Sequence, residues 1–263
     1  MKKQGSKLAS LLGPVALLAS LLGVCETASA QCPSSCNQST HHWNLGYTSG
    51  SESDSYVGMA NLGGTYYPAM CNGVNIYNID TNFAYSSAQL TQNTSFCTGG
   101  GNDKVQLLES GRWCYTSGFP VWVEPFDNNQ KRLTISGESG NDSIELGLDF
   151  KSRGAVGDHA LCGGSGNDTL YGGYDYQYVS GGGNDDRVWG GRQDDNVRGN
   201  SGNDTVLHPT YEGRDKLRGE AGNDCIYAGG STQSGSSCGD GADKYQSNGS
   251  QLSSCETAVS SCF

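Results

Sequence analysis

A single aliphatic residue recurs at every ninth position between residues 163 and 207. The stretch divides without a gap into five nonapeptides: GGSGNDTLY, GGYDYQYVS, GGGNDDRVW, GGRQDDNVR and GNSGNDTVL. Position 1 is always glycine, position 6 is often an acid, and position 8 is Leu170, Val179, Val188, Val197 or Val206. Glycine, Asn and Asp suit tight turns, and strand side chains alternate between two faces. Each unit is therefore predicted to be a turn over positions 1–6 and a short strand over positions 7–9, with position 8 pointing inward.

The nine-residue register continues beyond this stretch in both directions. Upstream copies are Gly154–Cys162 and Gly137–Glu145, and downstream copies are Gly219–Tyr227 and Cys238–Gln246. A period of the form G-G-x-G-x-D-x-U-x resembles the calcium-binding nonapeptides of the RTX (repeats-in-toxin) proteins. The resemblance implies an all-β fold, a right-handed parallel β-roll over residues 136–246, with Ca²⁺ as its cofactor.

The chemistry of the repeat also points to calcium. Burying one Val or Leu is worth about 1.5–3 kcal/mol, whereas fixing each backbone residue costs about 1–2 kcal/mol. Stacked turns would also place carboxylates about 5 Å apart, where each pair repels by ~3 kcal/mol. A hard dication between the turns would offset both costs, so binding and folding are expected to be one event.

The register distributes the predicted ligands over two edges of the roll. One edge is expected to carry Asp168, Asp186, Asp204, Asp224 and Asp243. The other is expected to carry Asp142, His159, Gln177 and Asp195, followed by Asp215. The nine-residue register nominates Asp186, while the G-N-D string nominates Asp185. An isolated repeat-like turn at Gly99–Val105 offers Asp103 as a further ligand.

The chain begins with a segment typical of export. Residues 1–30 combine a basic start, an apolar run and an A-x-A site, which predicts a signal peptide cleaved after Ala30 and a secreted protein. Cys25 leaves with that segment, and the ten remaining cysteines predict a disulfide framework whose pairing stays open. The net charge of −11 disfavours nucleic acid as a partner, and no later run is apolar enough to span a membrane.

Two flanking regions are expected to complete the molecule. Residues 31–135 are predicted to form a small disulfide-rich β region, of which residues 106–135 cap the roll. Residues 247–263 are expected to be a tail pinned by disulfides, since they contain Cys255 and Cys262.

The sequence favours a secreted calcium-binding structural or interaction protein. It contains no H-E-x-x-H, G-x-S-x-G or Walker sequence, so the prediction leans against an enzyme. Two alternatives remain: a small secreted hydrolase with its active site in residues 31–135, and a carbohydrate-binding or adhesive module.

One face of the predicted roll carries outward apolar residues at position 9. They are Tyr171, Trp189, Leu207 and Tyr227, which we call the ladder face. The opposite face has Cys162, Ser180, Arg198 and Arg218 at this position. An apolar ladder is expected either to be covered by residues 31–135 or to bind a polysaccharide or protein partner.

Overall fold

The fold is known from a computed structural model. It describes residues 42–44, 55–72, 75–79, 94–98, 100–107, 111–116, 119–124, 133–146, 159–174, 176–208, 213–229, 231–232, 234–247, 252–259 and 262. The predicted signal peptide and Ala30 lie outside these residues. Within them, the protein is all-β and contains no helix that could cross a membrane.

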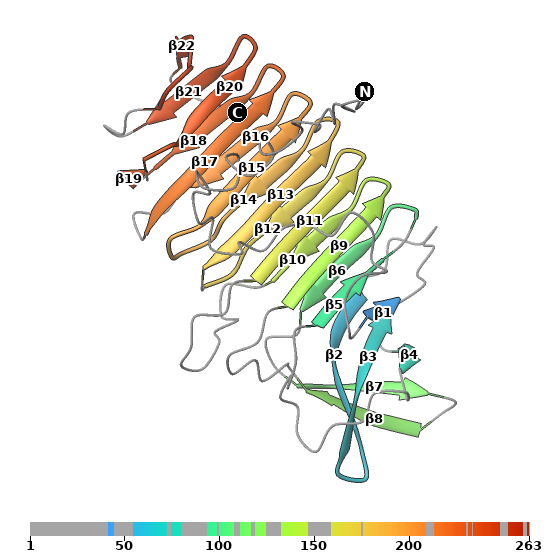
Figure 1. The fold of residues 1–263 in the computed structure, drawn as a ribbon. Coiled ribbons are helices and arrows are strands. Elements are labelled where there is room, and N and C mark those ends of the chain that lie inside the picture. The colour runs from blue at the N-terminus through green and yellow to red at the C-terminus, as the bar shows by residue number, and fades with distance from the viewer. Residues whose placement is uncertain are drawn as a thin grey trace, which may run out of the picture.

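Two sheets of mostly parallel strands form the body of the protein (Figure 1). Sheet 1 follows the order β1-β5-β9-β11-β13-β15-β17-β19, and β20 also pairs with β17. Its strands are β1 (His42–Asn44), β5 (Thr94–Cys97), β9 (Leu133–Ser139), β11 (His159–Ser165), β13 (Gln177–Gly183), β15 (Asn196–Ser201), β17 (Arg214–Ala221), β19 (Ser231–Thr232) and β20 (Ser237–Asp240).

Sheet 2 faces sheet 1 and receives the alternate strands of the chain. Its roll strands, from the C-terminal end, are β22 (Thr257–Ala258), β21 (Lys244–Ser247), β18 (Cys225–Ala228), β16 (Thr205–His208), β14 (Arg187–Trp189), β12 (Thr169–Tyr171), β10 (Ser143–Glu145), β6 (Lys104–Leu107) and β2 (Ser55–Leu62). Because the chain visits the two sheets in turn and neighbours pair in parallel, it winds as a β-solenoid, and the predicted parallel β-roll is confirmed.

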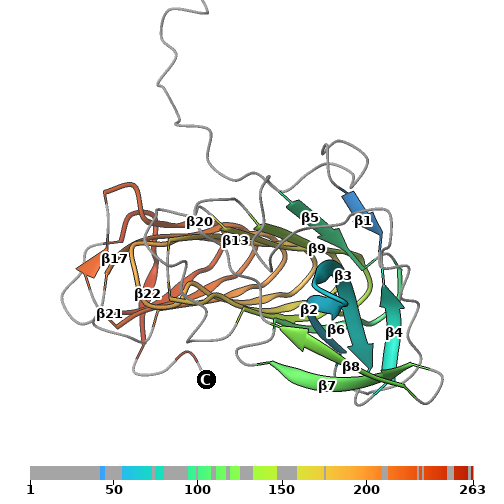
Figure 2. The same ribbon diagram turned by 90° about the horizontal axis from the view of Figure 1, so that it is seen from below.

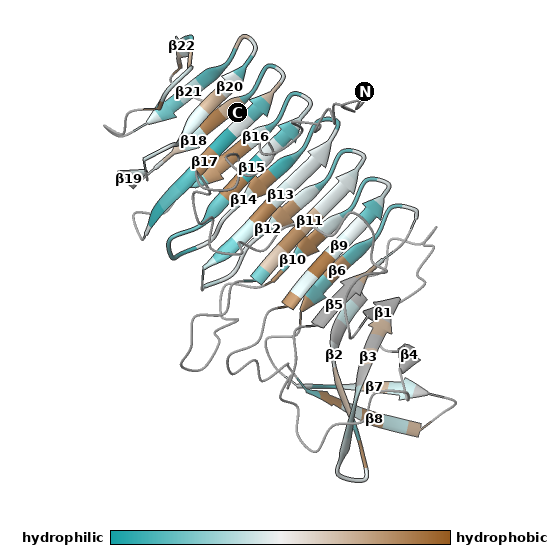
Figure 3. Ribbon diagram, viewed as in Figure 1, coloured by the Kyte–Doolittle hydropathy of each residue, from teal (hydrophilic) through white to brown (hydrophobic). Residues whose placement is uncertain are grey.

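The core is the row of position-8 residues between the two sheets. In sheet 2, Ile144, Leu170 and Val188 lie in register on neighbouring strands and are fully buried. The equivalent row of sheet 1 is Ile135, Leu161, Val179, Val197 and Leu217, and these are also fully buried. Figure 3 shows the rows as apolar bands across the strands. The inward direction predicted for position 8 is therefore confirmed.

The parallel ladders also continue upstream of residue 136. In sheet 1, β1 pairs with β5 and β5 with β9; in sheet 2, the start of β2 pairs with β6 and β6 with β10. Apart from the single repeat-like turn at Gly99–Val105 that leads into β6, these coils lack the nonapeptide pattern, so their pairing has almost no periodic signal in the sequence. The region before the repeats therefore adds coils to the roll.

A small barrel closes the N-terminal end of the roll (Figure 2). Strand β2 continues from the roll ladder into this barrel, which also contains β3 (Thr65–Asn72), β4 (Asn75–Ile79), β7 (Arg112–Thr116) and β8 (Phe119–Glu124). The ring closes because β8 pairs with both β7 and β2. The Cys71–Cys114 disulfide and Val123 are buried inside it. Strand β2 thus belongs both to the barrel and to the N-terminal coil of the roll.

The glycines of the turns include one adjacent pair that permits a matched test. Gly182 has φ of 126°, and a Cβ there would overlap the carbonyl group of Gly164 in the preceding coil. Gly183 is not among the positive-φ residues, and a Cβ there would lie 3.8 Å from its nearest neighbour.

We therefore expect Gly182→Ala to destabilise the protein by at least about 1–3 kcal/mol, the cost of backbone strain alone. Gly183→Ala is expected to be neutral or slightly stabilising because it only restricts the unfolded chain. Urea unfolding of both variants at saturating calcium would measure the difference. If the two variants had equal free energies of unfolding, the turn at Gly182 would not pack against the Gly164 carbonyl group as described.

Candidate calcium-binding edges

The glycine-rich turns that lead into the sheet 2 strands stack along one side of the roll, which we call edge A. Each turn ends in an aspartate that directly precedes its strand. These aspartates are Asp103, Asp142, Asp168, Asp186, Asp204, Asp224 and Asp243, and all are at most 4% exposed. All five predicted metal ligands assigned to this edge lie on it, Asp142 lies here instead of on the opposite edge, and Asp103 heads the column.

The placement of Asp142 differs from the prediction, which put it on the opposite edge. Strand β10 pairs with β12, and the backbone N–H of Asp142 donates to Asp168 Oδ1 at 2.7 Å. The two aspartates are 26 residues apart, whereas Asp168 and Asp186 are 18 apart. The eight extra residues make one coil longer and add no turn to either edge. A count of nonapeptides that includes them therefore places Asp142 on the wrong edge.

One hydrogen bond links each aspartate to its neighbour along edge A. The backbone N–H of Asp168 donates to Asp186 Oδ1, and that of Asp186 donates to Asp204 Oδ1, both at 2.8 Å. The same bond joins Asp204 to Asp224 and Asp224 to Asp243. One carboxylate oxygen of every aspartate after Asp103 is thereby held in place by the preceding coil.

The second carboxylate oxygen is buried and has no hydrogen-bond partner among the residues that the structure describes. This holds for Oδ2 of Asp142, Asp168, Asp186, Asp204, Asp224 and Asp243. A buried charged oxygen without a partner is costly, so a column of six calls for a cation.

The glycine at position 1 creates the space beside this oxygen. A Cβ built on Gly163 would overlap Asp168 Oδ2 and approach the Gly181 carbonyl oxygen of the next coil. At Gly219, a Cβ would overlap Asp224 Oδ2 and the Cys238 carbonyl oxygen. Carboxylate and carbonyl oxygens can therefore come close together here because glycine has no Cβ. Any other residue would place its Cβ among these oxygens.

This oxygen set fits calcium. Among the described residues, no three His, Cys, Asp or Glu side chains converge in the way that a site built from side chains requires. A metal between the turns would need backbone carbonyl oxygens beside the carboxylates, and calcium accepts both in flexible geometry.

Burial changes the acidity of the column. It raises the pKa of Asp186 to about 8, of Asp142 and Asp204 to about 7, and of Asp168 and Asp224 to about 6. Loss of water around the charged form is the main cause, and the hydrogen bond from the preceding coil opposes it. Without a cation, the folded protein thus holds its buried carboxylates partly protonated near neutral pH.

A second ladder on edge A resolves the choice between Asp185 and Asp186. Asp185 is exposed, and its Oδ1 accepts the backbone N–H of Asn203 at 2.7 Å. It occupies position 5, where Asn141, Asn167, Asn203 and Asn223 make the same contact with the following coil. Asp186 is therefore the member of the buried column.

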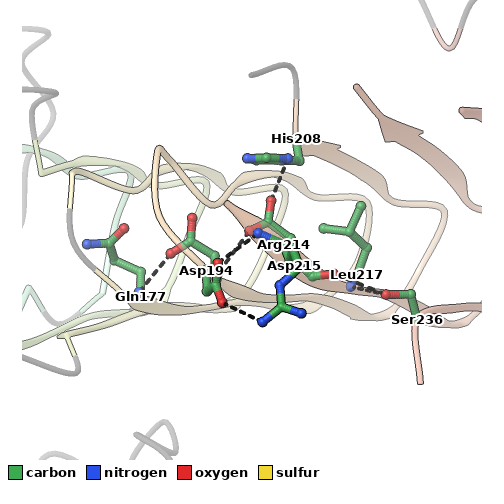
Figure 4. A network of polar contacts seen from close by, with 8 residues as sticks. Gln177, Asp194, His208, Arg214, Asp215, Leu217 and Ser236 are labelled. Carbon is green, nitrogen blue, oxygen red and sulfur yellow. Dashed lines mark hydrogen bonds and ion pairs between the residues drawn. The ribbon is translucent and has the colours of Figure 1, made fainter. Parts of the chain in front are cut away.

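The opposite side, edge B, carries the same ladder of backbone-to-carboxylate hydrogen bonds and adds a buried histidine (Figure 4). Asp195 Oδ1 accepts the backbone N–H of Gln177, and Asp215 Oδ1 accepts that of Asp195, both at 2.8 Å. His208 Nδ1 lies 2.7 Å from Asp215 Oδ2, and both side chains are buried. Burial raises the pKa of Asp215, while the contact with His208 opposes this shift. Sequence reasoning did not identify His208, which lies outside the position-6 register.

The comparisons with known proteins agree with this geometry. The model of the RTX calcium-binding nonapeptide repeat matches four copies, at residues 134–149, 163–175, 178–207 and 210–231. No curated protein matches the chain. The matches and the parallel β-roll together identify residues 134–231 as a stretch of RTX calcium-binding nonapeptide repeats.

Proposed function

We propose that this chain is a secreted structural or interaction protein whose roll folds around calcium ions held on edge A. The observation that carries the proposal is the column of buried Oδ2 atoms without hydrogen-bond partners. The proposed ligands are the carboxylates of Asp142, Asp168, Asp186, Asp204, Asp224 and Asp243, together with carbonyl oxygens of the adjacent turns. A bound calcium ion would supply the positive charge that these oxygens lack.

Edge B has a different role in this proposal. Asp195 and Asp215, which the sequence also nominates as ligands, lie in a hydrogen-bonded network with Gln177 and His208. The imidazole of His208 is placed to partner Asp215 without a metal. We therefore assign calcium to edge A and no metal to the His208–Asp215 pair of edge B.

A pair of substitutions on the two edges tests this assignment. Asp204→Ala removes a carboxylate that two neighbouring turns share, so we expect the loss of at least one bound calcium ion per chain. Gln177→Ala removes only the hydrogen bond that its Oε1 accepts from the Gly173 N–H, and calcium stoichiometry should not change. Isothermal titration calorimetry on chelator-treated protein would measure both. Equal stoichiometry in the two variants would refute calcium binding at Asp204.

Secretion is supported by the state of the cysteines. Three disulfides join Cys71 to Cys114, Cys225 to Cys262, and Cys238 to Cys255. Cys97 and Cys162 are disulfide-bonded as well. Such a framework belongs to an oxidising compartment, in keeping with a signal peptide cleaved after Ala30.

The ladder face supports a structural role better than polysaccharide binding. Its four members pair in register, but Leu207 is fully buried. The rings of Tyr171 and Trp189 stack with centroids 4.6 Å apart, and the Arg187 guanidinium lies 5.0 Å from the Trp189 centroid. The stacked pair uses one face of each ring, so these two faces are closed to a sugar. Cys225, on this face, is bonded to Cys262 of the tail rather than to residues 31–135.

The hydrolase alternative gains no support from the part of the chain that the structure describes. The barrel strands of residues 31–135 surround a small apolar core. We therefore keep the structural and interaction role as the proposal.

A further inference from the structure

The C-terminal tail forms a last coil that lies outside the repeats. Ser253 bridges to Ser237 in parallel on the sheet 1 side, and Cys238 N donates to Ser253 O at 2.9 Å. On the sheet 2 side, β22 pairs in parallel with β21. The tail thus visits both sheets as every earlier coil does.

The turn of this last coil carries a glutamate in place of the aspartate. Glu256 Oε2 accepts the backbone N–H of Asp243 at 2.7 Å, which is the contact that Asp243 Oδ1 itself makes with Asp224. Only 13 residues separate Asp243 from Glu256, compared with 19 between Asp224 and Asp243. The shortened turn lacks the glycine-rich loop, and the extra methylene of glutamate lengthens the reach of its carboxylate.

A disulfide fixes the position of this glutamate. Cys255, its immediate neighbour, is bonded to Cys238, which is fully buried at the end of the core. Cys238 stands at position 1 of its nonapeptide, where most units have glycine, so the terminal unit lacks the open space that glycine leaves beside the aspartate in the other units. The last turn is therefore anchored covalently to the preceding coil.

The aspartate beneath this turn has an unused oxygen. Asp243 is 0% exposed, and none of the described residues forms a hydrogen bond with its Oδ2. Glu256 is exposed and brings a second negative charge to the same place. Two adjacent ionised carboxylates, one of them buried, repel each other, and a cation between them would offset this repulsion.

We propose that Asp243 and Glu256 hold a further calcium ion at the C-terminal end of edge A, in a site that the Cys238–Cys255 disulfide positions. This inference rests on the calcium-binding function proposed above, but both of its ligands lie C-terminal to the residues that match the repeat. Because Glu256 is exposed, water completes the coordination shell, and this ion is bound more weakly than those between the repeats.

Glu256→Gln tests the site with little disturbance of the fold, because the amide oxygen can still accept the Asp243 N–H. Equilibrium dialysis of the full chain against calcium up to about 5 mM, above the range of weak extracellular sites, would count the bound ions. The wild-type chain is expected to bind one more ion than Glu256→Gln. Cys238→Ala/Cys255→Ala is expected to lose the same ion, and adding Glu256→Gln to it should cause no further loss.

Asp240→Asn is the matched control, since it removes one exposed charge from the neighbouring turn. It should bind as many ions as the wild-type chain. Full stoichiometry in Glu256→Gln, or equal loss in Asp240→Asn, would overturn the terminal site and leave the proposed function intact. A wild-type chain that binds no calcium would instead overturn the proposed function, and this site with it.

Discussion

Removing calcium is expected to lower the melting temperature of this protein by roughly 10–20 °C and to reduce its β-sheet content. Each ion present at 100 times its dissociation constant contributes about 2.7 kcal/mol. For a chain of this size, 1 kcal/mol shifts the melting temperature by about 2–4 °C, so two ions already account for the expected range. Circular dichroism with calcium and with chelator would measure both quantities.

The disulfides determine where the loss of structure should occur. Cys71–Cys114 lies in the N-terminal barrel, and Cys225–Cys262 and Cys238–Cys255 tie the tail to the last coils. We expect hydrogen exchange in the metal-free protein to rise most between β12 and β16, which these three disulfides do not span. Magnesium should not restore protection, because it requires stricter geometry and gives up water reluctantly. Unchanged circular dichroism and melting temperature after chelation would contradict calcium-dependent folding.

The metal-free protein is expected to become less stable as pH rises from about 4 to about 8, whereas most proteins lose stability in acid. Burial raises the pKa of Asp142, Asp186 and Asp204 to about 7, 8 and 7, from about 3.9 in an unfolded chain. Between these values the folded state binds more protons than the unfolded state. Raising the pH therefore removes protons mainly from the folded state and destabilises it.

Calcium should reverse this dependence because it binds the ionised carboxylates. Chelation should then lower the melting temperature much more at pH 8 than at pH 5, and calcium binding near pH 7 should release protons. Thermal unfolding at both pH values, and titration heats in two buffers of different ionisation enthalpy, would measure these effects. Asp186→Asn should flatten the pH dependence of the metal-free protein. A metal-free chain that is more stable at pH 8 than at pH 5 would show that the column is not buried as described.

The repeats themselves allowed much of the fold to be predicted. Within residues 163–207, every unit has the same length, so the aliphatic position fixes which side chains enter the core and which aspartates share an edge. Leu170, Val188 and Val206 lie on one sheet, and Val179 and Val197 on the other, as the alternation requires. A strict period is informative because neighbouring coils must bury the same position.

The sequence was uninformative where this period fails. The stretch between Glu145 and His159 does not keep the nine-residue period, so the number of half-coils between them cannot be counted from the sequence. For this reason the predicted edge of Asp142 is wrong. The upstream coils and the last coil at Glu256 are held by parallel pairing between segments of unlike sequence. Such pairing joins residues far apart in the chain and has no local signature. Likewise, only the folded chain places His208 beside Asp215.

The alternation of the chain between two sheets limits how its length can change. Asp168, Asp186 and Asp204 follow one another at 18-residue steps, so one full coil consists of two nonapeptides. Deleting a single nonapeptide would move every later aspartate to the opposite side of the molecule and divide the column in two. Deleting or duplicating a pair would keep all later residues on their present side, and the barrel and the tail would still close the ends. The roll can therefore lengthen or shorten in evolution by whole coils, but not by halves.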